Sequence, residues 1–309
     1  MTDADRSHFE DNLLTVRDWL RYAVTAMTRA HLVFGHGTST AIDEAAFLIL
    51  STLDLPIDDI NPWLDCRLLK DERRAIGSIL SKRIATRKPA AYLTNRAYIQ
   101  GRRFYIDERV IVPRSFIGEL LCEEGFASIV PDRFAVRRVL DLCTGSGCLA
   151  ILAAEAFPNA DIHASDISAD ALAVARRNID DYGLNARIQT FHADLFDGLP
   201  GEGYDLILSN PPYVAGAEVA AFPPEYQAEP QLAHLGGADG LDLVRRILEA
   251  TPEHLTETGN LVVEIGTGQE LLEAARPDLP FLWLDTETSQ GEVFTLTASD
   301  LAKTKTDRG

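Results

Sequence analysis

The sequence contains few cysteines, few basic residues and no long hydrophobic run. Its cysteines are scattered without a Cys-x-x-Cys pair, at Cys66, Cys122, Cys143 and Cys148. This spacing favours free thiols over disulfides or a zinc site. No apolar run approaches the length of a membrane span, and the N-terminal segment lacks a signal-peptide core. These absences predict a cytoplasmic protein without a metal site.

Positive charge is scarce. The chain has 29 lysines and arginines against 47 aspartates and glutamates, which gives a formal net charge of -18 at pH 7. Basic residues gather only in pairs such as Arg73-Arg74 and Arg137-Arg138, whereas binding to a phosphate backbone needs larger clusters. Direct binding of nucleic acid is therefore not expected. An acidic surface favours encounter with a basic partner protein, although the same charge would also serve solubility alone.

The composition is that of a globular protein, with 46% hydrophobic and 25% charged residues. The length allows one large and one smaller domain. Residues 1–88 have apolar positions at helical spacing and predict an N-terminal helical domain. Its helices are expected over 8–33, after Thr40 and over 65–86, and Thr40-Ala41-Ile42-Asp43 has the form of a capping box.

A linker with a β-hairpin is predicted over residues 89–115. Two short β-type runs, Tyr98-Ile99 and Phe104-Tyr105-Ile106, are joined by Gln100-Gly101, and Val110-Ile111-Val112 follows as a third run. This segment connects the helical domain to the rest of the chain.

Strands and helices alternate over residues 116–302 at the spacing of a parallel, doubly wound sheet. The expected strands are Val139–Leu142, Ile162–Ser165, Ile188–His192, Tyr204–Ser209, Leu261–Glu264, Phe281–Leu284 and Val293–Leu296. The fold class is therefore α/β. The tail, residues 303–309, is expected to be disordered.

A glycine-rich turn follows the first of these strands. Gly145 and Gly147 allow the backbone to approach a ligand closely, and Ala150 completes a Gly-x-Gly-x-x-Ala spacing. Asp166 ends the second strand and is placed to accept hydrogen bonds from both hydroxyls of a ribose. These residues predict an adenosine-containing cofactor. A nicotinamide dinucleotide fits them as well as any other cofactor of this kind.

The fourth strand ends in Asn210-Pro211-Pro212-Tyr213. The prolines supply carbonyl oxygens without backbone donors, and Pro211 keeps Asn210 extended. The Asn210 side-chain oxygen and the Pro211 carbonyl can each accept an N–H from one planar amide or amine, with the Tyr213 ring against its flat face. A plain turn is the alternative interpretation, because Asn-Pro and Pro-Pro are common in turns.

Together these motifs resemble the class I methyltransferases, which use S-adenosylmethionine. The resemblance adds the acidic Asp194 after the third strand, and it implies a Rossmann-like domain over residues 116–302. It implies a cofactor site formed by Asp141, Cys143, Thr144, Gly145, Ser146, Gly147, Asp166, Asp194, Leu195 and Asn210. It implies catalytic roles for Asn210, Pro211, Pro212 and Tyr213. The Asn-Pro-Pro-Tyr loop is similar to that of enzymes that methylate planar nitrogen, either adenine in DNA or a glutamine amide in a protein.

Nearly the whole chain resembles the HemK-type protein glutamine methyltransferases. The matching features are the helical domain, the hairpin, 107–115, Glu229-Pro230 and 240–243. The segment Pro113–Glu119 is similar to the branch that methylates the large-subunit ribosomal protein uL3, although Phe116 departs from the proline expected there. The release-factor branch typically carries Pro-Arg-Pro-Asp-Thr-Glu in this segment. The resemblance implies a basic ribosomal protein as partner, recognised by the helical domain, with a release factor as the alternative substrate.

Other functions are weighed against the same residues. A DNA adenine methyltransferase is disfavoured by the acidic charge and the lack of a basic recognition segment. A non-catalytic binding module would require a broken active loop, and none is visible. A dehydrogenase would need a hydride-accepting site, whereas His163 and His192 are expected to be ordinary strand residues. Methyl transfer from a sulfonium needs no metal, because the methyl group is already activated.

Overall fold

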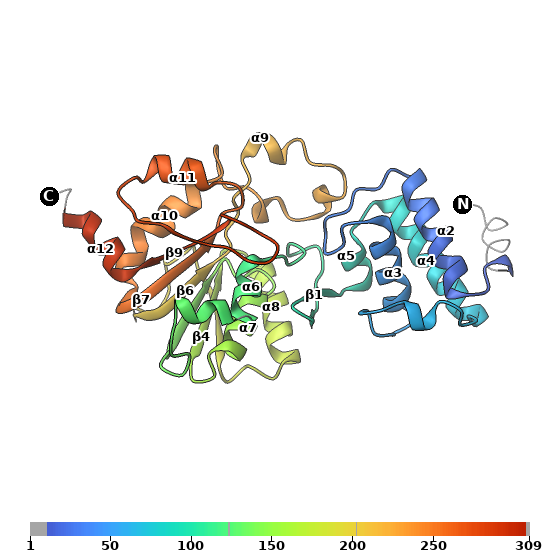
Figure 1. Ribbon diagram of the computed structural model, residues 1–309, viewed down its shortest axis with the longest axis horizontal. Helices are drawn as coiled ribbons and strands as arrows, with labels where there is room; N and C mark the ends of the chain where they lie inside the picture. The colour runs from blue at the N-terminus through green and yellow to red at the C-terminus, as the bar shows by residue number, and fades with distance from the viewer. Residues whose placement is uncertain (1–10, 123, 202, 307–309) are drawn as a thin grey trace. The chain divides into compact units, whose positions relative to one another are not determined.

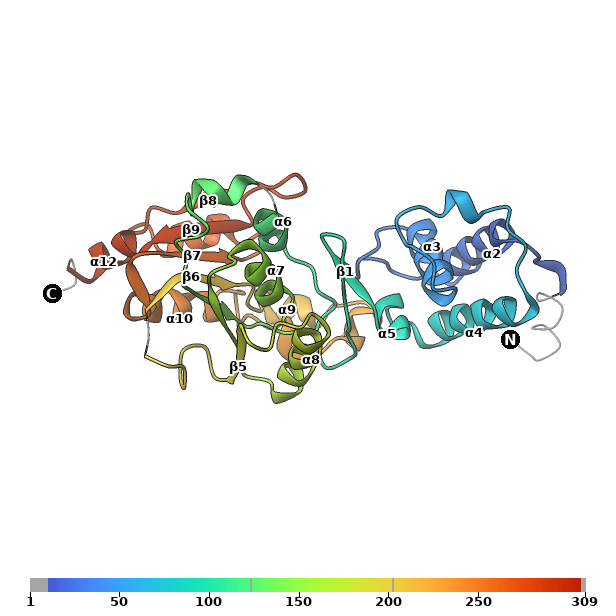
Figure 2. The ribbon, with the colours of Figure 1, turned by 90° about the horizontal axis from the view of Figure 1, so that it is seen from below.

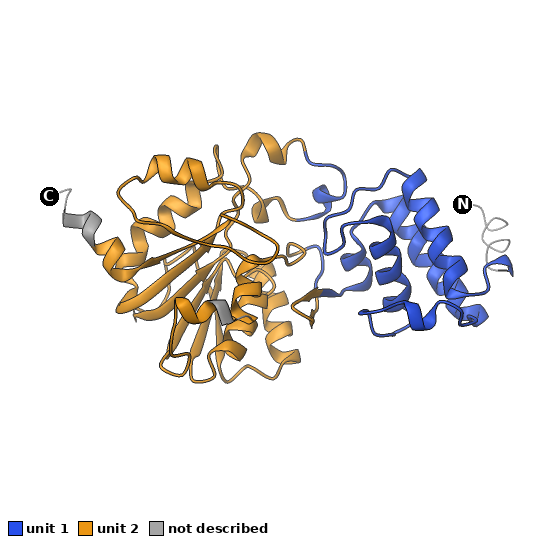
Figure 3. Ribbon diagram, in the orientation of Figure 1, with its two compact units in different colours: residues 1–97, 106–108, 222–229 blue, residues 98–105, 109–221, 230–309 orange. Residues whose placement is uncertain are grey.

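The computed structural model describes residues 11–122, 124–201 and 203–306. The chain divides into two compact units, coloured separately in Figure 3. The first, here the helical unit, comprises residues 1–97, 106–108 and 222–229. The second, here the sheet unit, comprises residues 98–105, 109–221 and 230–309. The functional domain boundaries given above stay predictions.

Capping side chains set where the helices of the helical unit begin. Thr15 and Asp18 form a reciprocal capping box, so α2 starts at Val16, while residues 8–10 of the first expected helix lie outside the described residues. The Thr40 hydroxyl accepts the N–H of Asp43, which confirms the predicted start of the second helix. The helices are α2 Val16–Arg29, α3 Ala41–Thr52, α4 Lys70–Thr86 and α5 Ala90–Thr94, with a 3-10 turn at Asn61–Trp63.

The start predicted near residue 65 for the third helix is wrong. α4 begins at Lys70 because the Glu72 carboxylate accepts the N–H of Leu69 at 2.7 Å, which satisfies a donor at the helix end. The core of the unit is apolar, and its fully buried members include Trp19, Met27, Leu48, Ile49, Ile76 and Leu80.

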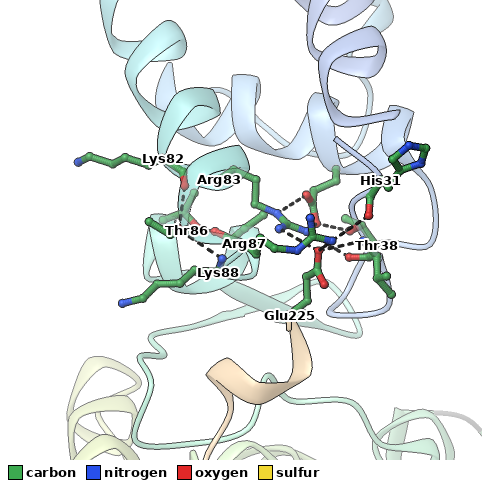
Figure 4. Close-up of polar contacts among 12 residues, drawn as sticks. His31, Thr38, Lys82, Arg83, Thr86, Arg87, Lys88 and Glu225 are labelled. Carbon is green, nitrogen blue, oxygen red and sulfur yellow. Dashed lines mark hydrogen bonds and ion pairs between the residues drawn. The ribbon is translucent and has the colours of Figure 1, made fainter. Parts of the chain in front are cut away.

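A group of buried charges holds segment 222–229 in the helical unit (Figure 4). Glu225 accepts the N–H of Val33 at 3.0 Å and forms an ion pair with Arg87 at 2.7 Å. Arg83 lies 3.9 Å from Glu225 and pairs with Glu44 at 2.7 Å. The side chains of Arg83, Glu44 and Glu225 are at most 1% exposed, so water screens these charges little.

Replacing Glu225 by Ala is expected to destabilise the helical unit by about 3 to 5 kcal/mol, because it leaves buried arginine charge without its partner. Urea unfolding measures this in a Trp283→Phe background, where the remaining tryptophans, Trp19 and Trp63, both belong to the helical unit. The exposed Asp58 provides a control, since Asp58→Ala should leave the transition unchanged. A Glu225→Ala protein with the parental stability would contradict the importance of these ion pairs.

The predicted hairpin consists of β1 Ala97–Ile99 and β2 Arg102–Phe104, which form a two-stranded sheet, and all of it except Ala97 belongs to the sheet unit. The hairpin is therefore confirmed. Val110-Ile111-Val112 is not a strand, and Phe104 is the last residue of β2. Val110 and Val112 bury their side chains without joining a ladder, so apolar character alone gave the wrong prediction for this run.

The main sheet has the strand order β5-β4-β3-β6-β7-β9-β8. Its strands are β3 Arg138–Leu142, β4 Asp161–Asp166, β5 Ile188–His192, β6 Tyr204–Ser209, β7 Leu255–Glu264, β8 Leu282–Leu284 and β9 Val293–Thr297. The pairs from β5 to β7 are parallel, and β9 is antiparallel to both of its neighbours. Each strand expected in this part of the chain is present, and the α/β class is confirmed.

Helices cover both faces of this sheet (Figures 1 and 2). Alternate strand residues such as Leu206 and Leu208 pack with α6, α7 and α8, whereas Ile207 packs with α10, α11 and α12. The helices are α6 Phe116–Cys122, α7 Cys148–Ala156, α8 Ala169–Asp181, α9 Gly216–Val219, α10 Asp242–Ala250, α11 Gln269–Ala275 and α12 Ala298–Thr306. Short 3-10 turns lie at Glu124–Ser128, Tyr226–Ala228, Gln231–Ala233 and Thr251–Glu253.

Helix α12 extends into the segment expected to be a disordered tail. It follows β9 directly because Thr297 and Asp300 cap its start: Thr297 donates its N–H to the Asp300 carboxylate at 3.1 Å and accepts the Asp300 N–H at 3.2 Å. Residues 307–309 lie outside the described residues. No helix in the described part of the chain is long and apolar enough to cross a membrane.

Candidate active site

The site lies where the strand order reverses, at the carboxyl ends of β3 and β6. These strands are parallel neighbours, and their register pairs Leu142 with Ser209. The Ser209 hydroxyl donates to the Leu142 carbonyl at 3.1 Å. Cys143 and Asn210 therefore leave the sheet next to each other, which brings the glycine-rich turn and the Asn-Pro-Pro-Tyr loop together. An open parallel sheet binds its ligand at such a switch point.

The glycine-rich turn has the backbone shape that its residues predict. Gly145 has a φ of +55°, and no atom lies within 4 Å of where its side chain would begin. Its backbone is thus open to a ligand. Gly147 is constrained for a different reason, because a side chain there would start 3.1 Å from Cβ of Ala175 in α8. This glycine permits close packing of α7 against α8.

Asp141 lies behind the turn rather than in the cavity. Its side chain is fully buried, and one oxygen accepts both the Thr144 hydroxyl and the Ala150 N–H, the latter at 3.0 Å. Burial raises the pKa of Asp141 to about 7, although both hydrogen bonds act in the opposite direction. Asp141 therefore fixes the turn to the start of α7.

Asp166 is already oriented by the backbone. One carboxylate oxygen accepts the N–H of Gly145 and the other that of Ser168, each at 2.9 Å. Burial raises the pKa of Asp166 above its usual range. Each carboxylate oxygen has a further lone pair, so this side chain can still accept the two hydroxyls of a ribose.

A cavity of about 370 Å³ opens at this edge of the sheet. Seven of the predicted site residues line it, namely Cys143, Gly145, Asp166, Asp194, Leu195, Asn210 and Pro212. The others do not contribute to its wall, namely Asp141, Thr144, Ser146, Gly147, Pro211 and Tyr213. The motif residues thus divide into those that face a ligand and those that shape the turn and the loop behind them.

The cavity also has residues that the sequence did not predict. Ile167, Leu232 and Leu235 line it and remain 49%, 57% and 48% exposed. Large apolar side chains left exposed around a cavity favour binding of an apolar or aromatic ligand group. Arg246 forms an ion pair with Asp194 at 2.9 Å. Of these residues only Ile167 could have been found from the sequence, because it directly follows the predicted site residue Asp166.

Asn210 is held by the chain segment before α6. Its Nδ2 donates to the Arg114 carbonyl at 3.1 Å. A carbonyl can only accept a hydrogen bond, so the atom of the Asn210 amide that faces Arg114 must be the nitrogen and not the oxygen. The side-chain oxygen of Asn210 is therefore the end that remains to accept from a ligand.

Tyr213 and Pro212 each pack closely against the backbone of a glycine, Gly266 and Gly236 respectively. A side chain at Gly266 would start 2.7 Å from the Tyr213 ring, and one at Gly236 would start 2.7 Å from the Pro212 carbonyl oxygen. Burial, followed by the negative charge of Glu264, raises the pKa of the Tyr213 hydroxyl. The Tyr213 ring thus anchors the end of the loop, a role that the sequence did not suggest.

Comparisons with known proteins agree with this geometry. A family model described as a methyltransferase small domain matches residues 124–222. The hMettl16 catalytic domain, solved in complex with a MAT2A 3'UTR hairpin, has the same type of fold, with a TM-score of 0.50 and 14% identity, covering 71% of this chain and 81% of that chain. Fold and site therefore define a Rossmann-like methyltransferase.

Similar sequences narrow this class to one family. A protein of Bradyrhizobium diazoefficiens named ribosomal protein uL3 glutamine methyltransferase is 52% identical over 294 residues, which cover 94% of this chain and 92% of that protein. A protein of the same name in Bordetella pertussis is 51% identical over 289 residues, covering 94% and 97% of the two chains. The chain belongs to the family of ribosomal protein uL3 glutamine methyltransferases.

The buried carboxyl of Asp141 makes a prediction about pH. An exposed aspartate has a pKa near 3.8, whereas folded Asp141 keeps its proton to about pH 7. Unfolding therefore releases a proton between these values, and rising pH favours the unfolded chain. Asp141→Asn removes this effect while keeping a side-chain oxygen that can accept from both the Thr144 hydroxyl and the Ala150 N–H.

The unfolding free energy of Asp141→Asn, relative to the parent protein, should rise by a few kcal/mol from about pH 4 to pH 7. Urea unfolding at several pH values measures the difference. The exposed Asp161 of β4 serves as the control, because Asp161→Asn should track the parent at each pH. Parallel curves for Asp141→Asn and the parent would contradict the raised pKa.

Proposed function

We propose that this chain transfers a methyl group from S-adenosylmethionine to a side-chain amide nitrogen of a glutamine in ribosomal protein uL3. Membership of the family supports the reaction and the substrate, and the acidic net charge of -18 favours encounter with a basic protein. The observation that carries the chemistry is the fixed amide of Asn210 at the cavity wall. A ribosomal protein as substrate also supports a cytoplasmic location.

The cavity provides for the methyl donor. Asp166 would accept the ribose hydroxyls, and the open backbone at Gly145 would lie against the donor. Asp194 and Leu195 would flank the adenine, with Ile167 as additional apolar surface. When bound, S-adenosylmethionine supplies a methyl carbon made electrophilic by positive sulfur. No buried acid or base of the chain is needed to activate it.

The chain's own part in the reaction is to position the acceptor. An amide nitrogen is a poor nucleophile because its lone pair is shared with the carbonyl, so it needs alignment and electrostatic support. The Asn210 oxygen, which lies at the cavity wall, would accept one of its N–H groups and direct the nitrogen toward the methyl carbon. Acceptance of the other N–H by the Pro211 carbonyl stays a prediction, because Pro211 does not line the cavity. The surplus proton would leave to water. Packing of Tyr213 on the substrate amide stays a prediction.

The identity of the substrate can be tested directly. Labelled S-adenosylmethionine is supplied with purified uL3 or, separately, with purified release factor from the same organism, and mass spectrometry locates the label. We expect a methylated glutamine in uL3 and none in the release factor. Label in the release factor alone would show that the release factor, and not uL3, is the substrate. Label in neither protein would contradict the proposed function.

Two asparagine variants make the same assay specific for the site. Asn210→Ala removes an acceptor that acts in the transition state, so turnover should fall on the order of hundredfold. Asn159→Ala is the matched control. Asn159 also donates to a backbone carbonyl, that of Phe134 at 3.0 Å, but it does not line the cavity. It should keep the parental turnover.

A further inference from the structure

Glu264 ends β7 and is a buried carboxyl group to which the proposed reaction gives no role. Its side chain is 2% exposed, and it does not line the cavity. One of its oxygens accepts the Ser115 hydroxyl at 2.7 Å and the Phe116 N–H at 2.9 Å. It therefore grips the chain immediately after Arg114.

These hydrogen bonds to Glu264 matter because the segment before α6 does not pair with any strand. Residues 111–115 form neither strand nor helix, so no strand ladder or helix fixes their backbone, and the contacts of Ser115 and Phe116 with Glu264 help to hold it. The Arg114 carbonyl belongs to the peptide unit that joins Arg114 to Ser115, and Ser115 is held by Glu264. Ser115 also accepts the Ile117 N–H at 3.2 Å, which ties the same residue to the start of α6.

The other end of the Asn-Pro-Pro-Tyr loop packs just beyond β7. Burial and the negative charge of Glu264 both raise the pKa of the Tyr213 hydroxyl. The Tyr213 ring packs on Gly266, two positions after Glu264. The carboxyl end of β7 thus meets both the segment that holds Asn210, through Glu264, and the tyrosine that ends the loop, beside Gly266.

We propose that Glu264 is a positioning residue for methyl transfer, because it holds the peptide whose carbonyl orients the Asn210 amide. The inference rests on the proposed function, because it takes Asn210 as the group that holds the substrate nitrogen. Glu264 itself touches neither donor nor acceptor. Its loss changes the direction in which the Asn210 oxygen points, and a misplacement of this kind lowers turnover more than it weakens binding.

Glu264→Gln tests the role with little change of shape. We expect kcat for uL3 methylation to fall about tenfold and the affinity for S-adenosylmethionine, measured by calorimetry, to change less than about twofold. The matched control is Glu119→Gln. Glu119 is also buried, at 8% exposed, and also accepts one N–H and one hydroxyl, from Glu287 and Thr288, but has no link to Asn210. It should leave kcat unchanged.

A double-mutant cycle separates positioning from a structural role. If Glu264 acts through Asn210, Glu264→Gln should lower kcat by less than about twofold in an Asn210→Ala background. An equal loss in both backgrounds, or a loss matched by Glu119→Gln, would overturn the inference. Should Glu264→Gln fail to fold, Ser115→Ala repeats the cycle with the carboxylate retained, and a few-fold loss confined to the parent background is expected.

The cycle also distinguishes the two proposals. If Asn210→Ala lowers turnover and Glu264→Gln does not, this inference fails and the proposed function stands. If Asn210→Ala itself leaves turnover unchanged, the role of Asn210 fails and the role of Glu264 fails with it.

Discussion

One hydrogen bond decides what the Asn-Pro-Pro-Tyr loop can do, the bond from Nδ2 of Asn210 to the Arg114 carbonyl. It commits the donor end of the amide to the protein and leaves the acceptor end for a substrate. An acceptor at this place suits an incoming N–H and does not suit a carbonyl or a carboxylate. The preference for a hydrogen-bond donor at this place therefore follows from a contact made within the chain, before any substrate is bound.

Three carboxyl groups at the carboxyl ends of strands keep the surrounding loops in place, and those of Asp141 and Glu264 are buried. Asp141 near the end of β3, Asp166 at the end of β4 and Glu264 at the end of β7 each accept at least one backbone N–H. Burial raises the pKa of each of them. Their cost in desolvation is offset by hydrogen bonds that rigid loops need and that water would otherwise provide. The site is thus preorganised by three carboxyl groups, of which only Asp166 lines the cavity.

Much of this arrangement could be predicted from local patterns, and the rest depends on distant contacts. Short apolar runs gave all strands of the main sheet, and Thr40 gave the start of α3, because burial on both faces and capping act within a few residues. Val110–Val112 was wrongly predicted to be a strand, because Val110 and Val112 are buried without strand pairing, and an apolar run does not distinguish the two cases. The role of Glu264 could not be predicted, since its partner Phe116 is 148 residues away in the sequence and only the topology brings them together.

The central claim is that the Asn210 oxygen holds the substrate nitrogen in line with the methyl donor. A crystal structure with the demethylated donor product and a glutamine peptide of uL3 tests it most directly. The account predicts the glutamine amide nitrogen at about 3 Å from the Asn210 side-chain oxygen, with Nδ2 still on the Arg114 carbonyl. A glutamine amide bound elsewhere, with no room for it between residue 210 and the sulfur, would contradict the account.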